Sequence, residues 1–365
     1  MIIPCANPLA QFLSHQSEIE AAVLNVLRAN NYILGSEVEA FETEFSRFIG
    51  TKFAVGVANG TDALELALRS LNIGLGDEVI TVSHTAVATV AAIEAVGAIP
   101  VLVDVDPISF TLNPENLPEA LSSKTKAIIA VHLYGHPANL EPIKEFCLQN
   151  EIYLIEDVSQ AHGAEYMGKK LGSIGDIGCF SCYPTKNLGA IGDAGIVTTS
   201  DSDIAKRIRM IREYGWEKRY ISELSGRNSR LDELQAAILR VKLRFLDQSN
   251  DSRIKIAEKY SKGLVNPSIQ KPSTLNNVKH VFHLYVIRVK NRDKFIQEMG
   301  VKHIGLGIHY PIPIHLQSAY KNRIKVSRHM EVTEKLSKDV VSLPIFPELS
   351  MLDVDRVIES ANLLA

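Results

Sequence analysis

Residues 53–82 read FAVGVANGTDALELALRSLNIGLGDEVITV and contain two short apolar runs separated by a helical pattern. The apolar runs, 53–57 and 79–82, have the length and composition of buried strands. Between them apolar residues recur at helical spacing, and Gly74 is expected to end that helix. The recurring residues are Leu64, Ala67, Leu68 and Leu71. A strand, a helix and a strand in succession predict a βαβ unit with parallel strands.

The same alternation continues to about residue 199. The apolar runs 100–103, 127–131 and 152–155 are expected strands. Residues 87–96 form a helical run that Gly97 stops. Because strands alternate with helices, the pattern predicts an α/β fold whose large domain has a mostly parallel central sheet flanked by helices.

Beyond residue 231 the pattern changes. A long helical stretch covers 234–260, a strand-like run covers 281–289, and a proline-rich loop covers 309–313. We place a domain boundary within residues 247–251. This boundary divides the chain into a large domain, residues 1–248, and a smaller α+β C-terminal domain, residues 249–365.

Composition and charge exclude several classes of protein. The chain has 365 residues, 46% of them hydrophobic, which is enough for a large cored domain and a smaller one. Lys and Arg total 39 against 42 Asp and Glu, and no block of like charge stands out. Binding to a nucleic-acid backbone needs a concentrated cationic face, so no nucleic-acid partner is expected.

The sequence also argues against a membrane or secreted protein. Its most apolar stretch, residues 86–103, is interrupted by Glu94, Gly97 and Pro100, so a helix, a turn and a strand explain it better than a membrane span. The N-terminal residues have no basic segment followed by a long apolar stretch. The four cysteines are too few and too scattered for a disulfide framework, so a reducing cytoplasm is expected. They are Cys5, Cys147, Cys179 and Cys182.

Cys179 and Cys182 have the C-x-x-C spacing of some metal and redox sites. The surrounding residues, 177–183, have the composition of a strand, and alternation along a strand would send the two sulfur atoms to opposite faces. Buried, unreactive thiols are therefore the better interpretation, and no metal site is predicted.

Three segments contain candidate chemistry, and the first is residues 59–64, NGTDAL, which follow a strand and open a helix. Free backbone N–H groups and the positive end of the helix dipole suit a phosphate there. The alternative is an ordinary helix cap by Thr61 or Asp62. No G-x-G-x-x-G motif lies at this turn, which argues against a dinucleotide site.

The second segment is the apolar strand ending in Glu156 and Asp157. Ligands of open α/β sheets collect at the carboxyl ends of strands, so Asp157 is placed where a cofactor could meet it. A carboxylate there could keep a pyridine nitrogen protonated, so that the ring acts as an electron sink. The alternatives are a helix cap and a surface salt bridge.

The third segment is residues 181–189, SCYPTKNLG, in which a strand runs into a turn with one lysine. Gly189, Gly192 and Gly195 permit close backbone approach around it. Most lysines in such loops are plain surface residues. A desolvated lysine has a lowered pKa and forms Schiff bases, so Lys186 is a candidate for covalent chemistry.

The three segments, in this order, resemble the nucleotide-sugar aminotransferases of the DegT family, within the aspartate-aminotransferase class of fold type I. The resemblance extends from residues 35–42, GSEVEAFE, to residues 343–349, LPIFPEL. It implies a pyridoxal 5'-phosphate-dependent sugar aminotransferase (transaminase). A related dehydratase branch has a histidine in place of the lysine, and Lys186 argues against that branch.

The resemblance also implies roles for individual residues. Lys186 matches the Schiff-base lysine, which also moves the substrate proton, and Asp157 matches the partner of the pyridine nitrogen. Asn228 matches a residue that reaches the phosphate of the neighbouring subunit, which implies a homodimer with shared active sites. The implied cofactor-binding residues are Gly60, Thr61, Asp62, Asp157, Gln160, Ser181, Lys186 and Asn228.

The substrate side matches the family less closely. His309, Tyr310 and His315 match a segment that the family uses near the sugar, although a proline-rich loop could simply connect elements of the small domain. Ala86 stands where the family often has an aromatic residue stacked on the cofactor ring, and an alanine cannot stack. Either His84 or another ring covers that face, or the cofactor is held differently.

We therefore expect an enzyme that moves an amino group from glutamate or glutamine to a keto sugar linked to a nucleotide diphosphate. One alternative is a regulatory or sensor protein that keeps the fold and the cofactor without turnover. A second alternative is a plain α/β nucleotide-binding protein that uses the turn at Gly60 for a different phosphate.

Overall fold

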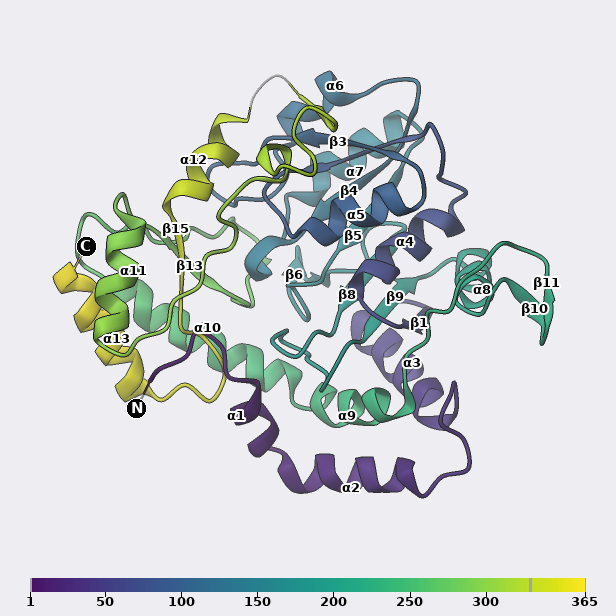
Figure 1. Ribbon diagram of the computed structural model, residues 1–365, viewed down its shortest axis with the longest axis horizontal. Coiled ribbons are helices and arrows are strands. Elements are labelled where there is room, and N and C mark those ends of the chain that lie inside the picture. Colours follow the sequence, from purple (N-terminus) through teal and green to yellow (C-terminus); the bar gives the residue numbers. More distant parts are fainter. Residues whose placement is uncertain (1, 328–329, 365) are drawn as a thin grey trace.

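The computed structural model describes residues 2–327 and 330–364, and an eight-stranded sheet lies at its centre (Figure 1). The strand order is β1-β9-β8-β5-β4-β2-β3-β14. The strands are β1 (Phe53–Val57), β2 (Glu78–Val82), β3 (Ile99–Val103), β4 (Thr125–Val131), β5 (Tyr153–Asp157), β8 (Ile177–Ser181), β9 (Gly195–Thr199) and β14 (Lys325–Val326). Strand β9 is antiparallel to both neighbours and the other pairs of this sheet are parallel. The predicted mostly parallel α/β sheet is confirmed.

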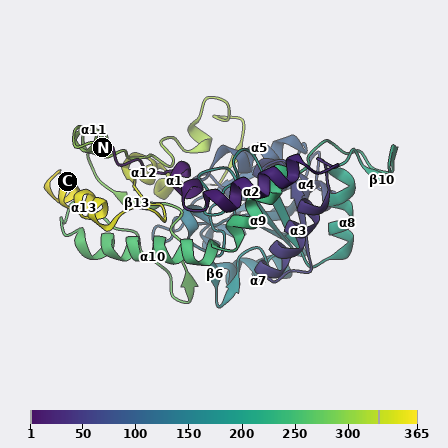
Figure 2. The same ribbon diagram turned by 90° about the horizontal axis from the view of Figure 1, so that it is seen from below.

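Helices cover the sheet on both sides, and Figure 2 shows α5 and α7 on opposite sides of it. Helix α4 is buried along most of its length because it packs against α5, α8, β8 and β9. The helices around the sheet are α1 (Pro8–Leu13), α2 (Gln16–Leu27), α3 (Ser36–Ile49), α4 (Gly60–Ser70), α5 (Val87–Ala95), α6 (Leu117–Ala120), α7 (Leu140–Gln149), α8 (Ser202–Ile211) and α9 (Glu233–Leu243).

A second hydrophobic core lies at the end of the molecule where both chain termini lie (Figure 1). Its elements are α10 (Leu246–Gly263), α11 (Arg292–Val301), α13 (Met351–Leu364) and the antiparallel pair of β13 (Tyr285–Arg288) and β15 (Val340–Leu343). Ile3, from the N-terminal segment, packs into this core of C-terminal elements. Helix α10 runs unbroken across the predicted border at 248/249, and that division of the chain stays a prediction.

Part of the C-terminal region returns to the large sheet. Strand β14 pairs with β3, and the Asp104 carboxylate after β3 accepts the backbone N–H groups of Val332 and Thr333, each at 2.9 Å. These two residues lie in α12 (Glu331–Asp339). The large sheet is therefore completed by residues that lie far along the chain.

Two small sheets lie apart from the eight-stranded sheet. One joins β6 (Glu165–Tyr166), β7 (Lys169–Lys170) and β12 (Val278–Lys279). The other is a hairpin of β10 (Trp216–Lys218) and β11 (Ile221–Ser222), which projects from the end of the molecule opposite the termini (Figure 1). Tyr220 and Ile221 are exposed on this hairpin.

Three expected elements differ from the structure. Helix α4 ends at Ser70 rather than at Gly74, because Asn72 already has a left-handed φ of 58°. The helical stretch 234–260 is two helices, interrupted between Leu243 and Leu246. The strand expected at 281–289 is shortened to β13, since the amides of Val281 and Leu284 bond to the carbonyls of Gly135 and Tyr134 instead.

Cys179 and Cys182 are both fully buried. The Cys179 Sγ lies 3.4 Å from the Ala63 carbonyl, and the Cys182 Sγ lies 4.0 Å from the His162 Nε2. Burial raises the pKa of Cys182 to about 12 and that of Cys179 well above its usual value. The structure thus agrees with unreactive thiols. Within residues 2–327 and 330–364, no helix is long and apolar enough to cross a membrane.

The packing of α3 on the sheet gives a stability prediction. The Phe45 ring is fully buried and meets the Phe180 ring edge to face, with the centroids 5.0 Å apart. Phe45→Ala should lower the free energy of unfolding in urea by about 3–5 kcal/mol, because it leaves a cavity under the sheet. Glu39→Ala, on the exposed face of the same helix, is the control and should change little. A loss no larger than that of the control would contradict this packing.

Candidate functional site

One cavity of about 540 Å³ lies between the N-terminus of α4, the carboxyl end of β5 and the turn after β8. Parallel strands β4 and β5 end at this edge of the sheet, which is where α/β folds collect their ligands. Seven predicted site residues line the cavity: Gly60, Thr61, Asp62, Asp157, Gln160, Ser181 and Lys186. The three sequence segments therefore do meet at one place.

The start of α4 leaves backbone donors free at the cavity. The helix cap is Asn59 and not Thr61 or Asp62, because the Asn59 Oδ1 accepts the Asp62 N–H at 2.8 Å. The amides of Gly60 and Thr61 have no acceptor within the described part of the chain. The Asp62 carboxylate turns to the Arg227 guanidinium at 3.3 Å, so Asp62 offers the cavity no uncompensated negative charge. Two free amides at a helix N-terminus suit an anion.

Gly60 also permits the close approach of Ser181. A Cβ atom on Gly60 would lie 2.4 Å from the Ser181 Cβ and 3.1 Å from its Oγ. Without that atom, the Ser181 hydroxyl at the end of β8 lies beside the free amides of α4. A hydroxyl group and two free N–H donors brought together at the cavity wall fit a phosphate group.

Asp157 ends β5 and is almost fully buried at the cavity wall. Its Oδ2 accepts a hydrogen bond from the Thr89 hydroxyl at 2.9 Å, and its Oδ1 accepts the Ser159 N–H at 3.2 Å. The two donors come from different elements of the fold, and together they fix the orientation of the carboxylate. Thr89 lies on α5, and the sequence analysis did not single it out.

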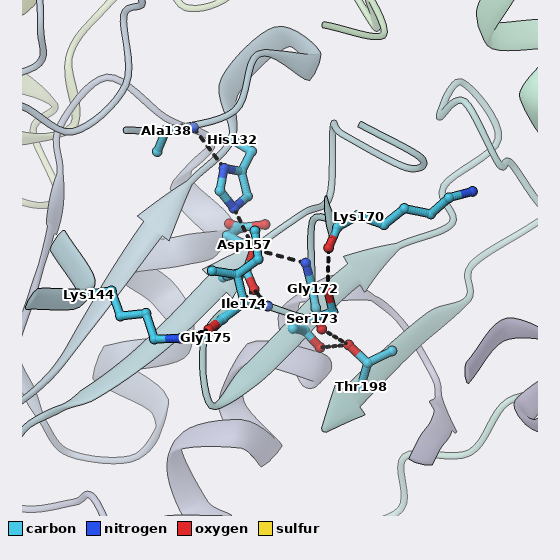
Figure 3. Close-up of polar contacts among 12 residues, drawn as sticks. His132, Ala138, Lys144, Asp157, Lys170, Gly172, Ser173, Ile174, Gly175 and Thr198 are labelled. Carbon is cyan, nitrogen blue, oxygen red and sulfur yellow. Dashed lines mark hydrogen bonds and ion pairs between the residues drawn. The ribbon is translucent and has the colours of Figure 1, made fainter. Parts of the chain in front are cut away.

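The neighbouring Glu156 points to the other face of the sheet, since side chains alternate along a strand. This carboxylate is fully buried. Its partners His132, Gly172, Ile174 and Gly175 are labelled in Figure 3. It accepts the His132 Nε2–H at 3.2 Å and three backbone N–H groups, those of Gly172, Ile174 and Gly175 at 2.8–2.9 Å. His132 is the Nε2–H tautomer, because its Nδ1 accepts the Ala138 N–H at 3.0 Å.

Burial alone would raise the pKa of Glu156, but the hydrogen bonds from His132 and the backbone amides outweigh it and lower that pKa. Glu156 is therefore an ion held by four donors directly behind Asp157. It stabilises the end of β5 and the loop at 172–175. Its partners lie 16 to 24 residues away along the chain, which is why the motif alone did not show this role.

Lys186 lies in the turn after β8 and is partly buried. Burial lowers its pKa to about 8, and the charge of Asp157 acts in the opposite direction. Within residues 2–327 and 330–364 the Lys186 Nζ has no hydrogen-bond or ion-pair partner. The amine is therefore poised to be partly neutral near neutral pH and free to react.

The residue after the lysine anchors the turn. The Asn187 Nδ2 donates to the Asn250 Oδ1 at 2.8 Å and to the Val281 carbonyl at 3.2 Å, and its Oδ1 lies 3.2 Å from the His283 Nδ1. Asn187 is almost fully buried. The backbone that carries Lys186 is thus tied to α10 and to the segment before β13, another feature that sequence reasoning missed.

The structure brings two of the three substrate candidates to the site. The Gln160 Nε2 donates to the Tyr310 hydroxyl at 3.0 Å, so the proline-rich loop meets the cavity wall. The His309 Nδ1 lies 2.8 Å from the Ser342 Oγ. Burial, followed by the charge of Lys186, lowers the pKa of His309 to about 4. His309 is therefore a neutral group within reach of the lysine charge, and Tyr310 meets the cavity wall through Gln160.

His315 is placed differently. Its Nδ1 lies 2.7 Å from the Ser83 Oγ and its Nε2 lies 3.3 Å from a Glu334 carboxylate oxygen, so both ring nitrogens are engaged away from the cavity. The structure gives His315 a packing role between β2 and α12 and no place on the cavity wall.

The His84 ring does not cover the cavity wall at Ala86. Ala86 lines the cavity, but His84 does not, because it is buried behind the wall with its Nε2 2.7 Å from the Tyr134 hydroxyl. The aromatic residue among the described lining residues is Tyr183, which is half exposed. The expectation that the His84 ring covers this face of the cavity is therefore wrong.

Asn228 is exposed and does not line the cavity of its own chain. Its backbone bridges to Glu213, and its neighbour Arg227 forms ion pairs with Asp62 and Glu65 on α4. The loop is thus fixed beside α4 with the Asn228 side chain at the surface. Its expected role toward a second subunit stays a prediction.

Comparison with known proteins gives full-length matches. The sequence profile described as the DegT/DnrJ/EryC1/StrS aminotransferase family matches residues 14–362. The dTDP-3-amino-3,6-dideoxy-alpha-D-galactopyranose transaminase of Aneurinibacillus thermoaerophilus is 46% identical over 350 residues, 96% of each chain. The erythromycin biosynthesis sensory transduction protein EryC1 of Saccharopolyspora erythraea is 43% identical over 359 residues, 98% of each chain. The crystal structure of S. venezuelae DesV in complex with a ketimine intermediate superposes with a TM-score of 0.97 at 41% identity and covers 99% of this chain and 98% of that chain.

The burial of Lys186 predicts its titration. In protein stripped of bound small molecules, carbamylation of Lys186 by cyanate should rise with pH around a midpoint of about 8 instead of the ordinary 10.5, because only the neutral amine reacts. Asp157→Asn should move the midpoint lower still, since the aspartate charge favours the ammonium form. Mass spectrometry of the Lys186 peptide measures this, with the exposed Lys52 as a reference for the reagent. A midpoint near 10.5 would contradict the burial.

Proposed function

The chain belongs to the DegT/DnrJ/EryC1/StrS aminotransferase family, and from this premise we propose that it transfers an amino group from glutamate or glutamine to a keto sugar linked to a nucleotide diphosphate. It is a pyridoxal-phosphate-dependent sugar aminotransferase of fold type I. The observation that carries the proposal is a desolvated lysine with no partner of its own, facing the same cavity as Asp157 and the free amides of α4.

The residues of the cavity fit this cofactor. The amides of Gly60 and Thr61, with the Ser181 hydroxyl, would hold its phosphate, and Asp157 would pair with its pyridine nitrogen. Gln160 would lie near its phenolic oxygen. When bound, pyridoxal phosphate supplies an aldehyde for amino-group transfer and a pyridinium ring that withdraws electrons from the reacting carbon.

Lys186 has two tasks in this proposal. Its Nζ would be the covalent anchor of the cofactor, and once released it would move a proton from the donor carbon to the C4′ carbon of the cofactor in the first half-reaction. In the second half-reaction it would move a proton from C4′ to the carbon of the acceptor. Its lowered pKa suits both tasks, because a neutral amine is needed to form the covalent bond and to accept a proton. Thr89 and Ser159 keep the Asp157 charge in place while this occurs.

The substrate assignment rests on the dTDP-sugar relative and on the loop at Gln160. His309 lies within reach of the lysine charge and Tyr310 lies beside Gln160, and these polar groups could bind hydroxyl groups of a sugar. The donor and acceptor would use the same cavity in turn, so the kinetics should be of the ping-pong type. His315 is left out of the proposed substrate site because both of its ring nitrogens are engaged elsewhere.

We further propose a homodimer in which Asn228 completes the phosphate site of the partner. Two observations support this proposal. Asn228 is exposed beside α4, and a mainly apolar groove of about 540 Å³ lies between α2 and α9 next to the lysine turn. The apolar residues of that groove are Phe12, Ile19, Val23, Leu24, Ile191, Leu234 and Ile238. An apolar groove of this kind favours burial against a second copy of the chain.

A regulatory protein with the same fold is the second candidate, since one relative is named a sensory transduction protein. Such a protein would need the cofactor cavity but no reactive lysine. The free Lys186 amine beside Asp157 favours the enzyme. A plain nucleotide-binding protein would need neither residue and would be colourless.

The spectrum of the purified protein tests the function. We expect an absorbance band near the visible edge that bleaches with glutamate or glutamine and returns with a keto sugar nucleotide, because the two half-reactions share one cofactor. Lys186→Ala should bind the cofactor through its phosphate yet show no turnover, since anchor and proton carrier are both lost. A band that no amino donor bleaches would favour the regulatory alternative. Normal turnover by Lys186→Ala would contradict the assignment of the lysine.

Mixed dimers test the shared site. One chain carries Lys186→Ala and the other carries Asn228→Asp, which sets a negative charge against the phosphate, so each homodimer should be nearly inactive. In a mixed dimer one site has both residues intact. Half of the randomly re-associated dimers are mixed, so activity should recover to roughly a quarter of that of wild type. With subunit exchange shown to be complete, no recovery would mean that Asn228 serves its own chain or does not touch the phosphate.

A further inference from the structure

Tyr134 connects the large sheet to the proline-rich loop. It lies just beyond β4 in a short 3-10 turn and is almost fully buried. Its hydroxyl has two partners, the His84 Nε2 at 2.7 Å and the backbone carbonyl oxygen of His309. The proposed function gives Tyr134 no task, although its partner belongs to the loop assigned to the sugar.

The order of the protons in this chain of hydrogen bonds follows from the chemistry of the groups. A carbonyl oxygen can only accept, so the single hydroxyl hydrogen of Tyr134 is donated to His309. His84 must then donate its Nε2–H to the Tyr134 oxygen. This assignment leaves the His84 Nδ1 as an acceptor, and that atom is buried without a partner in the described part of the chain. Burial lowers the pKa of His84 to about 4 and raises that of Tyr134, so both groups are neutral.

A second connection runs from the Tyr134 backbone to the same dipeptide. The Tyr134 N–H donates to the Gln160 Oε1 at 2.8 Å, and the Gln160 Nε2 donates to the Tyr310 hydroxyl at 3.0 Å. The Tyr134 side chain thus holds residue 309 while its backbone, through Gln160, holds residue 310. The Tyr134 carbonyl also accepts the Leu284 N–H at 3.2 Å.

The turn at Tyr134 has an unfavourable backbone conformation. Tyr134 has a left-handed φ of 61°, which is unfavourable for a bulky residue. Gly135 follows with a φ of 95°, and a Cβ atom there would lie 2.9 Å from the His283 amide. The turn therefore packs directly against the backbone at 282–283, and the Tyr134 side chain extends to His84 and His309.

We propose that Tyr134 is a positioning residue for the sugar substrate, because it fixes His309 and Tyr310 at the mouth of the cavity. This inference rests on the proposed function. Neither His309 nor Tyr310 lines the inner cavity, and Tyr134 does not contact it either. A small amino-acid donor can bind within that cavity, whereas a sugar on a nucleotide diphosphate must extend past its mouth. Loss of the Tyr134 hydroxyl should therefore impair the sugar half-reaction and spare the donor half-reaction.

Tyr134→Phe in the holoenzyme tests this inference, with Tyr166→Phe as the matched control. Tyr166 is also buried, and its hydroxyl likewise makes two hydrogen bonds, with Asn139 at 2.9 Å and Glu141 at 3.3 Å. Stopped-flow absorbance measures the bleaching by the amino donor and the return of the band with the keto sugar nucleotide. Hydrogen–deuterium exchange of the peptide covering residues 305–316 measures how firmly the loop is held, and it needs no substrate.

For Tyr134→Phe we expect the sugar half-reaction to fall about tenfold in kcat/KM and the donor half-reaction to stay within about twofold of wild type. The exchange of the 305–316 peptide should be faster than in wild type and in Tyr166→Phe. Equal loss in both half-reactions, or unchanged exchange, would overturn the inference. His84→Phe, which removes a donor to the same hydroxyl, should act in the same direction and replaces Tyr134→Phe if that variant fails to fold.

Failure of the proposed function has a different signature. If wild type accepts no keto sugar nucleotide, the proposed substrate is wrong. The exchange measurement then still decides whether Tyr134 holds the loop, since faster exchange in Tyr134→Phe supports that role and unchanged exchange overturns it.

Discussion

The site depends on keeping the Lys186 amine out of water. Lys186 keeps a lowered pKa only because its turn is packed against neighbouring segments, and packed segments bury further polar groups. The Lys242 Nζ, nearly buried, donates to the Gly189 carbonyl of the same turn at 2.7 Å. The Arg253 Nη1 donates to the Ile345 carbonyl at 3.0 Å. The Lys242 bond fixes the backbone of the lysine turn, and the Arg253 bond holds the C-terminal segment at Ile345.

Strand β5 shows how two adjacent carboxylates can have different tasks. Alternation sends Asp157 toward the cavity and Glu156 toward the opposite face. Glu156 is enclosed by His132 and three amides, which leaves it no open position for a ligand. Asp157 has only two donors and faces open space. The difference in surroundings, and not in residue type, separates the structural anion from the one available to a cofactor.

The sequence predicted what depends on local pattern. The order of strands and helices up to residue 199 follows from periodicity, and the place of Asp157 at a sheet edge follows from the topology of parallel sheets. The choice of Lys186, and its joining with Asp157 and the turn at Gly60, came from the family resemblance. Contacts between distant residues were not accessible in this way. Asn59 replaced Thr61 or Asp62 as the helix cap, the amides at 281–284 bonded to the turn at Tyr134 instead of extending a strand, and His315 was engaged by Ser83 and Glu334. The second and third of these outcomes were decided by partners elsewhere in the chain, whereas the helix cap was a choice among neighbouring residues.

The attachment of the proline-rich loop bears on attempts to change the sugar that the enzyme accepts. Residues 309–310 belong to the C-terminal half of the chain, yet the His309 carbonyl and the Tyr310 hydroxyl accept hydrogen bonds from Tyr134 and Gln160 of the N-terminal half. A loop grafted from a relative would keep its orientation only where it can make the same hydrogen bonds with residues 134 and 160. The exchangeable unit is therefore discontinuous, and a design must transplant the loop together with residues 84, 134 and 160. Recombination at a single crossover point between 160 and 309 would separate them.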